Sequence, residues 1–123
     1  MAETGLTDAM YAGNKRTLAF AVKDTAGAVF DITAYGVQFA LSEIDSDGIV
    51  SGAALVSKSD DDVAEIAVTD AANGLLQVYL VGADTAALLG DYHFELELVD
   101  DADSETVVVA EGTLEIRRNV VNA

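Results

Sequence analysis

The amino-acid sequence has no cysteine and no proline, and its 123 residues include only six lysines and arginines. The absence of cysteine excludes disulfide bonds, thiolate metal sites and a cysteine nucleophile. Without proline, the turns of the chain depend on glycine, asparagine and aspartate. No apolar run is long enough to span a bilayer, and the N-terminus lacks the basic and then apolar pattern of a signal peptide.

The six basic residues are outnumbered by 22 acidic residues, which gives a formal net charge of −16. A field of this sign repels phosphate backbones and anionic lipids, so we expect neither nucleic acid nor a membrane as a partner. Two explanations of the charge stay open. The acidic surface meets a basic partner or gathers cations, or it is an adaptation to high salt, in which carboxylate repulsion is screened. The excess of aspartate over glutamate, the three lysines and the abundant alanine resemble the composition of proteins from halophilic archaea.

The stretch from Val68 to Val99 gives the clearest structural signal. The residues 70–74 are typical of a tight turn, and a strand with one buried face is predicted after it. Asp84 is expected to cap a single helical turn that Gly90 ends, with a leucine closing one end of the core. A second strand with a regular alternation follows, so the pattern predicts two strands that pass between two sheets. The residues expected to point inward are Leu76, Val78, Leu80, Leu88 or Leu89, Tyr92, Phe94, Leu96 and Leu98.

The rest of the chain alternates short strands with turn signals about every ten residues. This spacing predicts an all-β fold, a small immunoglobulin-like β-sandwich of seven to eight antiparallel strands. We expect one sandwich domain over residues 14–118, an N-terminal arm over 1–13 and a C-terminal tail over 119–123. Further strands are predicted over 17–23, 29–32, 37–41, 53–57, 63–68 and 105–116, with a polar, flexible loop over 43–52, a charged turn over 59–62 and an acidic hairpin loop over 100–104.

Candidate chemistry is sparse. Asp45 and Asp47 occupy the third and fifth positions of a calcium-loop template, but Ala54 stands where the bidentate glutamate is needed. A solvated acidic loop therefore explains them better than a metal site. His93 shares a strand face with Glu95 and Glu97, an arrangement that needs a further nucleophile or ligand before it can catalyse. We expect no enzymatic activity, no cofactor and no metal.

Two parts of the chain are candidate subunit contacts. The N-terminal arm either frays or docks on a neighbouring subunit. In the last strand, residues 107–109 are apolar on both faces, which indicates either a bulge at Gly112 or cover by another chain. Two arginines after this strand either anchor acidic neighbours or only end the strand. The predicted interface residues are Leu6, Met10, Tyr11, Val107, Val109, Arg117 and Arg118.

Four segments carry a family resemblance: YAGNKRTLAFAVKDTAGAVFDITAYGVQFAL, VTDAANGLLQVYL, DTAALLGDYHFELELVD and EGTLEIRR. Together they cover roughly residues 11–117. They resemble the small immunoglobulin-like domain of tailed-phage virion proteins, including the N-terminal domain of the phage baseplate upper protein family. In such domains a D-x-x-G hairpin leads to a V-D-I/L-T-G-A segment and an aromatic-bearing strand, and here residues 30–36 read Phe-Asp-Ile-Thr-Ala-Tyr-Gly, so the expected Thr-Gly-Ala is altered.

The resemblance implies a non-enzymatic structural protein of a virion, present in many copies or as a homo-oligomer beside other virion proteins. It favours the tail or baseplate, with capsid decoration as the next choice, and the composition adds a halophilic host. An alternative from another class is a binding module for a host-surface glycan or for cations, which would use the loops 43–52 and 100–104. A third hypothesis is an enzyme that uses His93 with Glu95 or Glu97.

Overall fold

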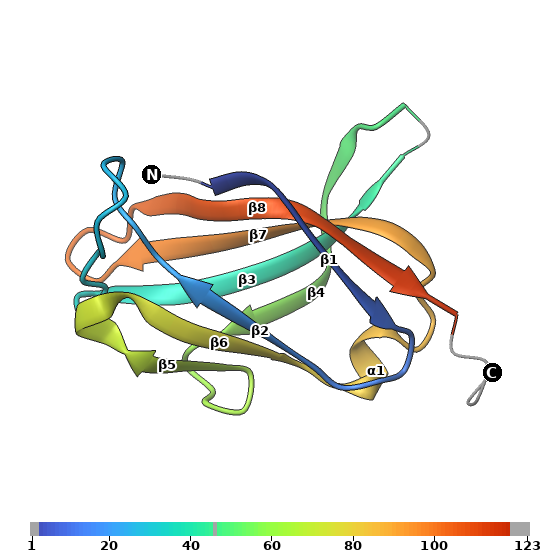
Figure 1. The fold of residues 1–123 in the computed structure, drawn as a ribbon, viewed down its shortest axis with the longest axis horizontal. Coiled ribbons are helices and arrows are strands. Elements are labelled where there is room, and N and C mark those ends of the chain that lie inside the picture. Colours follow the sequence, from blue (N-terminus) through green and yellow to red (C-terminus); the bar gives the residue numbers. More distant parts are fainter. Residues whose placement is uncertain (1–2, 46, 119–123) are drawn as a thin grey trace.

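The computed structural model describes residues 3–45 and 47–118, and these form eight strands and very little helix. Five strands make one sheet in the order β1-β8-β7-β3-β4, and three make a second sheet in the order β2-β6-β5 (Figure 1). The strands are β1 (Glu3–Tyr11), β2 (Arg16–Ala21), β3 (Tyr35–Ile44), β4 (Val50–Ser59), β5 (Ile66–Asp70), β6 (Leu75–Leu80), β7 (Gly90–Asp100) and β8 (Thr106–Arg117); a 3₁₀ turn covers Ala71–Asn73 and the short helix α1 covers Gly82–Thr85.

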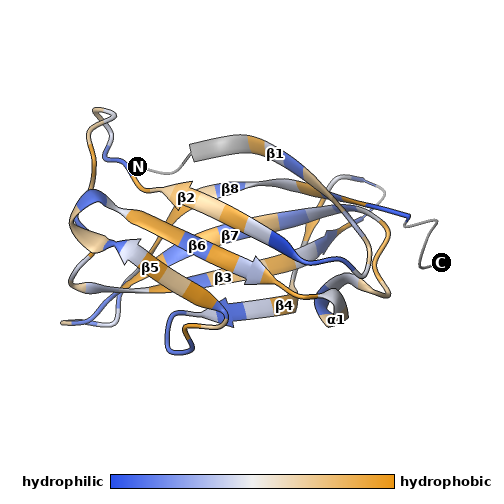
Figure 2. Cartoon of the chain, turned by 60° about the horizontal axis from the view of Figure 1, so that its bottom comes forward, coloured by the Kyte–Doolittle hydropathy of each residue, from blue (hydrophilic) through white to orange (hydrophobic). Residues whose placement is uncertain are grey.

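The two sheets pack face to face, with the three-stranded sheet in front of the larger one in Figure 2. Strand order β2-β6-β5 and β8-β7-β3-β4 is the order of the two sheets in an immunoglobulin-like sandwich. The predicted fold class is therefore confirmed. The connection from β6 to β7 passes from one sheet to the other, as the alternation in residues 68–99 predicts.

The core lies between the sheets and is built from the inward residues of each alternating strand. Phe39 and Phe94, on neighbouring strands of the larger sheet, stack with their ring centroids 6.0 Å apart. Phe20 of β2 contacts both rings across the core, with centroid separations of 6.4 and 6.2 Å. These contacts hold the two sheets together at the centre of the sandwich.

Strand β1 pairs with β8 in parallel, which is the one departure from the expected antiparallel arrangement. Its residues lie in the segment predicted to be an N-terminal arm, so the structure places most of that segment in the larger sheet. Gly112 is the reason that β1 fits. A Cβ at this position would lie 2.1 Å from the carbonyl oxygen of Leu6. The predicted bulge at Gly112 is in fact at Val109, where the partners of Leu96 and Glu97 skip one residue of β8.

The connections around β6 show what local sequence can predict. The turn over residues 70–74 is confirmed, and Gly74 ends it with a φ of 70°. The helical turn is confirmed as well, but Asp84 is its third residue rather than its N-cap, and its carboxylate accepts the N–H of Val81 at 2.8 Å. Gly90 opens β7 instead of ending the helix, and Leu88 rather than Leu89 packs against the core.

Three predicted segments differ from the structure. Residues 29–32 form only one isolated bridge, between Lys23 and Val29, instead of a strand. The strand predicted over 63–68 begins at Ile66, because the preceding residues turn and leave Val63 exposed. The segment predicted as a loop over 43–52 contains the ends of two strands: β3 continues to Ile44, β4 begins at Val50, and Ile44 pairs with Val50.

Candidate functional site

The hairpin between β3 and β4 projects beyond the body of the sandwich (Figure 1). Asp45 closes its tip, because its Oδ1 accepts the backbone N–H groups of Asp47 and Ile49, both at 2.9 Å. Ile49 is 64% exposed and Leu55 is 45% exposed, and Val50 is also exposed. The hairpin therefore exposes apolar side chains, with Ile49 and Val50 near its tip and Leu55 between Ala54 and Val56, which pair with β3 in the body of the sheet. The sequence contained this signal, but the surrounding polar residues led to the prediction of a solvated loop.

The Oδ1 atom of Asp45 thus accepts hydrogen bonds within its own turn. Among the described residues, neither Asp45 nor Asp47 belongs to a group of three or more residues that could hold a metal ion.

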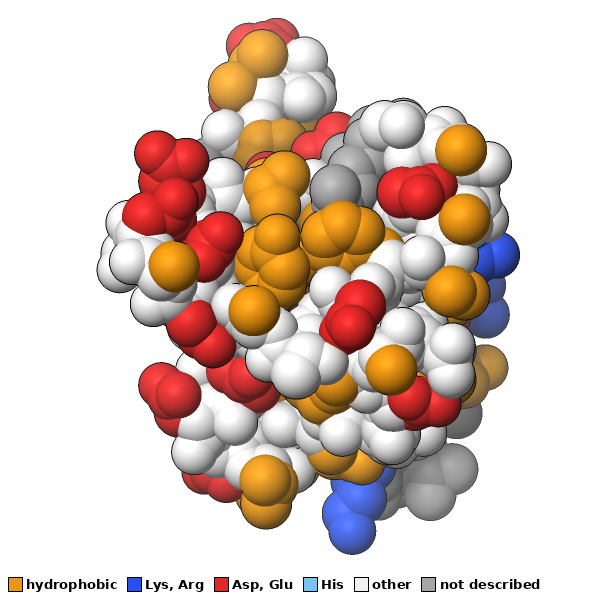
Figure 3. Space-filling model, turned by 90° about the vertical axis from the view of Figure 1, so that its left-hand side faces the viewer, with side chains coloured by type: hydrophobic (Ala, Val, Ile, Leu, Met, Phe, Trp, Pro, Cys, Tyr) orange, Lys and Arg blue, Asp and Glu red, His pale blue; other side chains and the backbone are white. Residues whose placement is uncertain are grey.

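The opposite end of the molecule carries the connections β2–β3, β5–β6 and β7–β8 (Figure 1). Backbone hydrogen bonds tie these loops together, from Asp101 N to Ala34 O at 3.1 Å and from Ile32 N to Ala71 O at 2.9 Å. Phe30 and Tyr35 pack there with ring centroids 5.6 Å apart. In Figure 3, which faces this end, apolar side chains lie in the middle and carboxylates lie around them.

Many aspartates at this end form their own turns. Asp24 accepts the N–H groups of Ala26 and Ala28, and Asp100 accepts that of Ala102. Asp31 accepts both the hydroxyl and the backbone N–H of Thr33, and these bonds hold the pKa of the Asp31 carboxyl below its usual range. In this chain without proline, several turns are stabilised by aspartate side chains that accept backbone N–H groups of the same turn.

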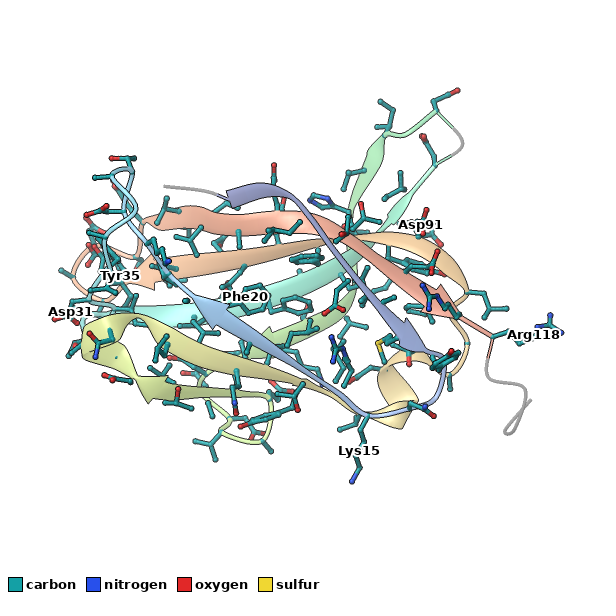
Figure 4. All side chains as sticks on the ribbon, in the orientation of Figure 1. Lys15, Phe20, Asp31, Tyr35, Asp91 and Arg118 are labelled. Carbon is teal, nitrogen blue, oxygen red and sulfur yellow. The ribbon has the colours of Figure 1, made fainter. Side chains whose placement is uncertain are left out.

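The two loops of the binding-module hypothesis lie at opposite ends. On the β3–β7 ladder, Glu43 is opposite Tyr92 near the projecting hairpin, whereas Tyr35 is opposite Asp100 at the other end. Figure 4 shows Asp31 and Tyr35 at one end of the molecule and Arg118 at the other. The loops 43–52 and 100–104 consequently do not combine into one site.

The structure does bring three potential metal ligands together on the outer face of the larger sheet. The Nε2 atom of His93 lies 3.1 Å from Oε1 of Glu95 and 4.0 Å from Oε2 of Glu111. Glu95 and Glu111 are direct partners on the β7–β8 ladder. Glu97, which the sequence placed beside His93, is opposite Val108 and is not part of this group. The sequence could not predict that Glu111 lies beside His93, because this proximity depends on the register in which β8 pairs with β7.

The seven predicted interface residues divide by burial. Met10 and Val109 belong to the core of their own chain, and Leu6 packs against it. Tyr11 and Val107 are exposed large apolar residues, and the two arginines are exposed as well. Hydrogen bonding and charge from Glu115 raise the pKa of the Arg117 guanidinium, and Tyr11 acts in the same direction. A subunit contact at the exposed residues stays a prediction: Tyr11, Val107, Arg117 and Arg118.

Comparison with known proteins adds no identification. The sequence matches no protein-family model and no curated protein at a significant level. In the described part of the chain, no helix has the length and apolar character needed to cross a bilayer.

Proposed function

We propose that this chain is a non-enzymatic structural subunit of a tailed virus particle, located in the tail or baseplate and produced in a halophilic host. It acts in many copies, in contact with other copies and with other virion proteins. Two things support the proposal: the sequence resemblance to tailed-phage virion domains, and the immunoglobulin-like sandwich that such a resemblance implies.

The projecting β3–β4 hairpin is the observation that carries the proposal. Exposed apolar side chains that extend beyond the body of a domain commonly mark a contact with another protein. Fully burying a side chain such as Ile49 or Leu55 contributes about 1.5–3 kcal/mol. Two or three such side chains, repeated at every contact of a ring or tube, supply much of the free energy of assembly.

The hairpin also lies at an edge of the larger sheet. Strand β4 forms one edge and β1 forms the other. Exposed strand edges pair with other chains unless they are protected. A hairpin that extends past the sheet offers apolar side chains beside an edge strand, which fits insertion between neighbouring subunits.

The first experiment measures the mass of the purified chain in solution by light scattering, at low and at molar potassium chloride. We expect a discrete ring-sized oligomer such as a trimer, pentamer or hexamer. The variant Ile49→Asp with Leu55→Asp should reduce it to a monomer, because each change places a charge in the buried contact. Val63→Asp is the matched control, since Val63 is 76% exposed and lies outside the hairpin. A wild-type monomer at both salt concentrations contradicts self-assembly.

Location in a virion needs a separate measurement. Antibodies against the chain should label the tail or baseplate of purified particles in electron micrographs. Label on the head would move the proposal to capsid decoration, and particles without label would contradict a role in the virion.

The enzyme hypothesis has a simple test. Replacement of His93 by alanine should leave assembly and infectivity unchanged if the chain is only structural. A variant that assembles normally but yields particles unable to infect would instead revive a role for this histidine beyond structure.

A further inference from the structure

We propose that His93, Glu95 and Glu111 form a binding site for a divalent transition-metal ion of the zinc type. This proposal does not depend on the proposed function, because the site lies within one chain. The three residues come from two adjacent strands, β7 and β8, on the outer face of the larger sheet. Their potential ligand atoms all lie within 4.8 Å of one another.

The distances between the ligand atoms fit a small metal ion. Zinc binds imidazole nitrogen and carboxylate oxygen at about 2.0–2.2 Å in tetrahedral geometry, which places neighbouring ligand atoms about 3.3–3.6 Å apart. The separations from His93 Nε2 to the two glutamate oxygens are 3.1 and 4.0 Å and bracket this value. Binding requires the Glu111 oxygen to move closer to Nε2 of His93 by about half an ångström to reach the upper end of this range.

The charges around His93 favour a divalent ion. Glu95 and Glu111 face each other directly across the ladder, and like charges in this position destabilise a sheet. A protonated histidine neutralises only one of the two carboxylates. A divalent ion bound by a neutral imidazole and both carboxylates removes the whole imbalance. The overall charge of −16 adds a long-range attraction for cations.

The site is also well held. Strand β7 lies between β8 and β3, so the backbone of His93 is fixed by ladders on both sides. Its direct partners are Thr113 on β8 and Ser42 on β3. The imidazole is largely buried, with 15% of the side chain exposed, whereas the glutamates are more open. A site of this kind keeps its histidine oriented and leaves a coordination position open to water.

The identity of the ligands selects the metal. An imidazole nitrogen favours zinc, nickel, copper and iron, whereas magnesium and calcium prefer oxygen ligands alone. The binding of zinc should therefore depend on His93, and calcium should bind weakly and without any dependence on it. This distinguishes a defined site from the general attraction of an acidic surface for cations.

Isothermal titration calorimetry of the full chain with zinc chloride tests the proposal, in molar potassium chloride so that diffuse attraction is screened. We expect one zinc ion per chain. His93→Ala and Glu111→Gln should each weaken binding by at least about tenfold, because loss of even an outer-shell partner costs this much. Glu97→Gln is the matched control, as it removes one carboxylate from the same strand face without touching the site.

NMR gives a readout at the site itself, because His93 is the only histidine in the sequence. Zinc should shift its imidazole resonances in the wild-type chain and in Glu97→Gln, and cobalt chloride should give visible absorption that disappears in His93→Ala. Imidazole resonances that do not respond to zinc would overturn the proposal. So would zinc binding of equal affinity in His93→Ala, which would mean that the acidic surface alone holds the ion.

Discussion

The ammonium nitrogen of Lys58 lies 2.8 Å from Oδ2 of Asp84 and joins the edge strand β4 to the helical connection between the sheets. Both side chains are largely buried, and the same carboxylate oxygen accepts the N–H of Val81. Lys58 is opposite Phe39 on the β3–β4 ladder, so it points toward the core. One of the three lysines in the chain is therefore used for a buried ion pair.

Removal of this ion pair should destabilise the fold. We expect Lys58→Met to lower the free energy of unfolding by about 3 kcal/mol, because it leaves the Asp84 carboxylate without its partner in a buried place. Urea unfolding followed by circular dichroism measures this. The double variant Lys58→Met with Asp84→Asn should recover part of the loss, since no buried charge is left unpaired. An unchanged midpoint in Lys58→Met would show that the pair contributes nothing to stability.

Gly112→Ala should displace β1 from β8. The new Cβ would lie 2.1 Å from the carbonyl oxygen of Leu6, and overpacking of this kind costs about 1–3 kcal/mol. Amide hydrogen exchange should show faster exchange in β1 while the exchange in β3 stays slow. Gly52→Ala is the control, because a Cβ there meets no atom within 4 Å. Equal exchange rates in the two variants would contradict the close approach of the strands.

Asp31 should titrate below the usual pH range of an aspartate. Its pKa is lowered first by the hydroxyl of Thr33 and then by the backbone N–H of the same residue. Because the folded-state pKa is the lower one, the contribution of these bonds to stability is present above about pH 4 and is lost as the pH falls through the folded pKa. Thr33→Val should raise the pKa measured by NMR titration, and Thr33→Ser should keep it low. A pKa that is the same in all three chains would contradict this cause.

Salt should stabilise the protein if its acidity is an adaptation to a saline cell. The screening length falls from about 10 Å at 0.1 M to about 3 Å at 1 M, so repulsion among surface carboxylates weakens steeply over this range. We expect the melting temperature to rise between low and molar potassium chloride. A flat profile would indicate that the acids serve a partner instead, or that their main task is the shaping of turns seen at Asp24 and Asp100.

Local alternation was enough to predict β6, β7 and the turn before β6. In each case the pattern lies within a few residues, as with Leu76, Val78 and Leu80. The pairing of β1 with β8 could not be predicted in this way, because it joins segments about a hundred residues apart and depends on the absence of a side chain at Gly112.

The candidate metal site could also be predicted only in part from the local sequence. His93 and Glu95 are close in the sequence and share a strand face, so their proximity could be predicted. Glu111 joins them only because β8 pairs with β7 in one register, and a bulge at Val109 lies between this pair and Glu97. The apolar hairpin was misjudged for another reason: its exposed residues are few and stand among aspartates, serines and glycines.

The pairing of β1 with β8 also has a consequence for the order of folding. Strand β1 pairs only with β8 in the larger sheet, so β1 takes its place only after the intervening strands and β8 have been synthesised. Until β8 is available, β1 has no partner strand in this sheet. The placement of β1 therefore depends on β8, and a truncation within β8 releases β1 as well.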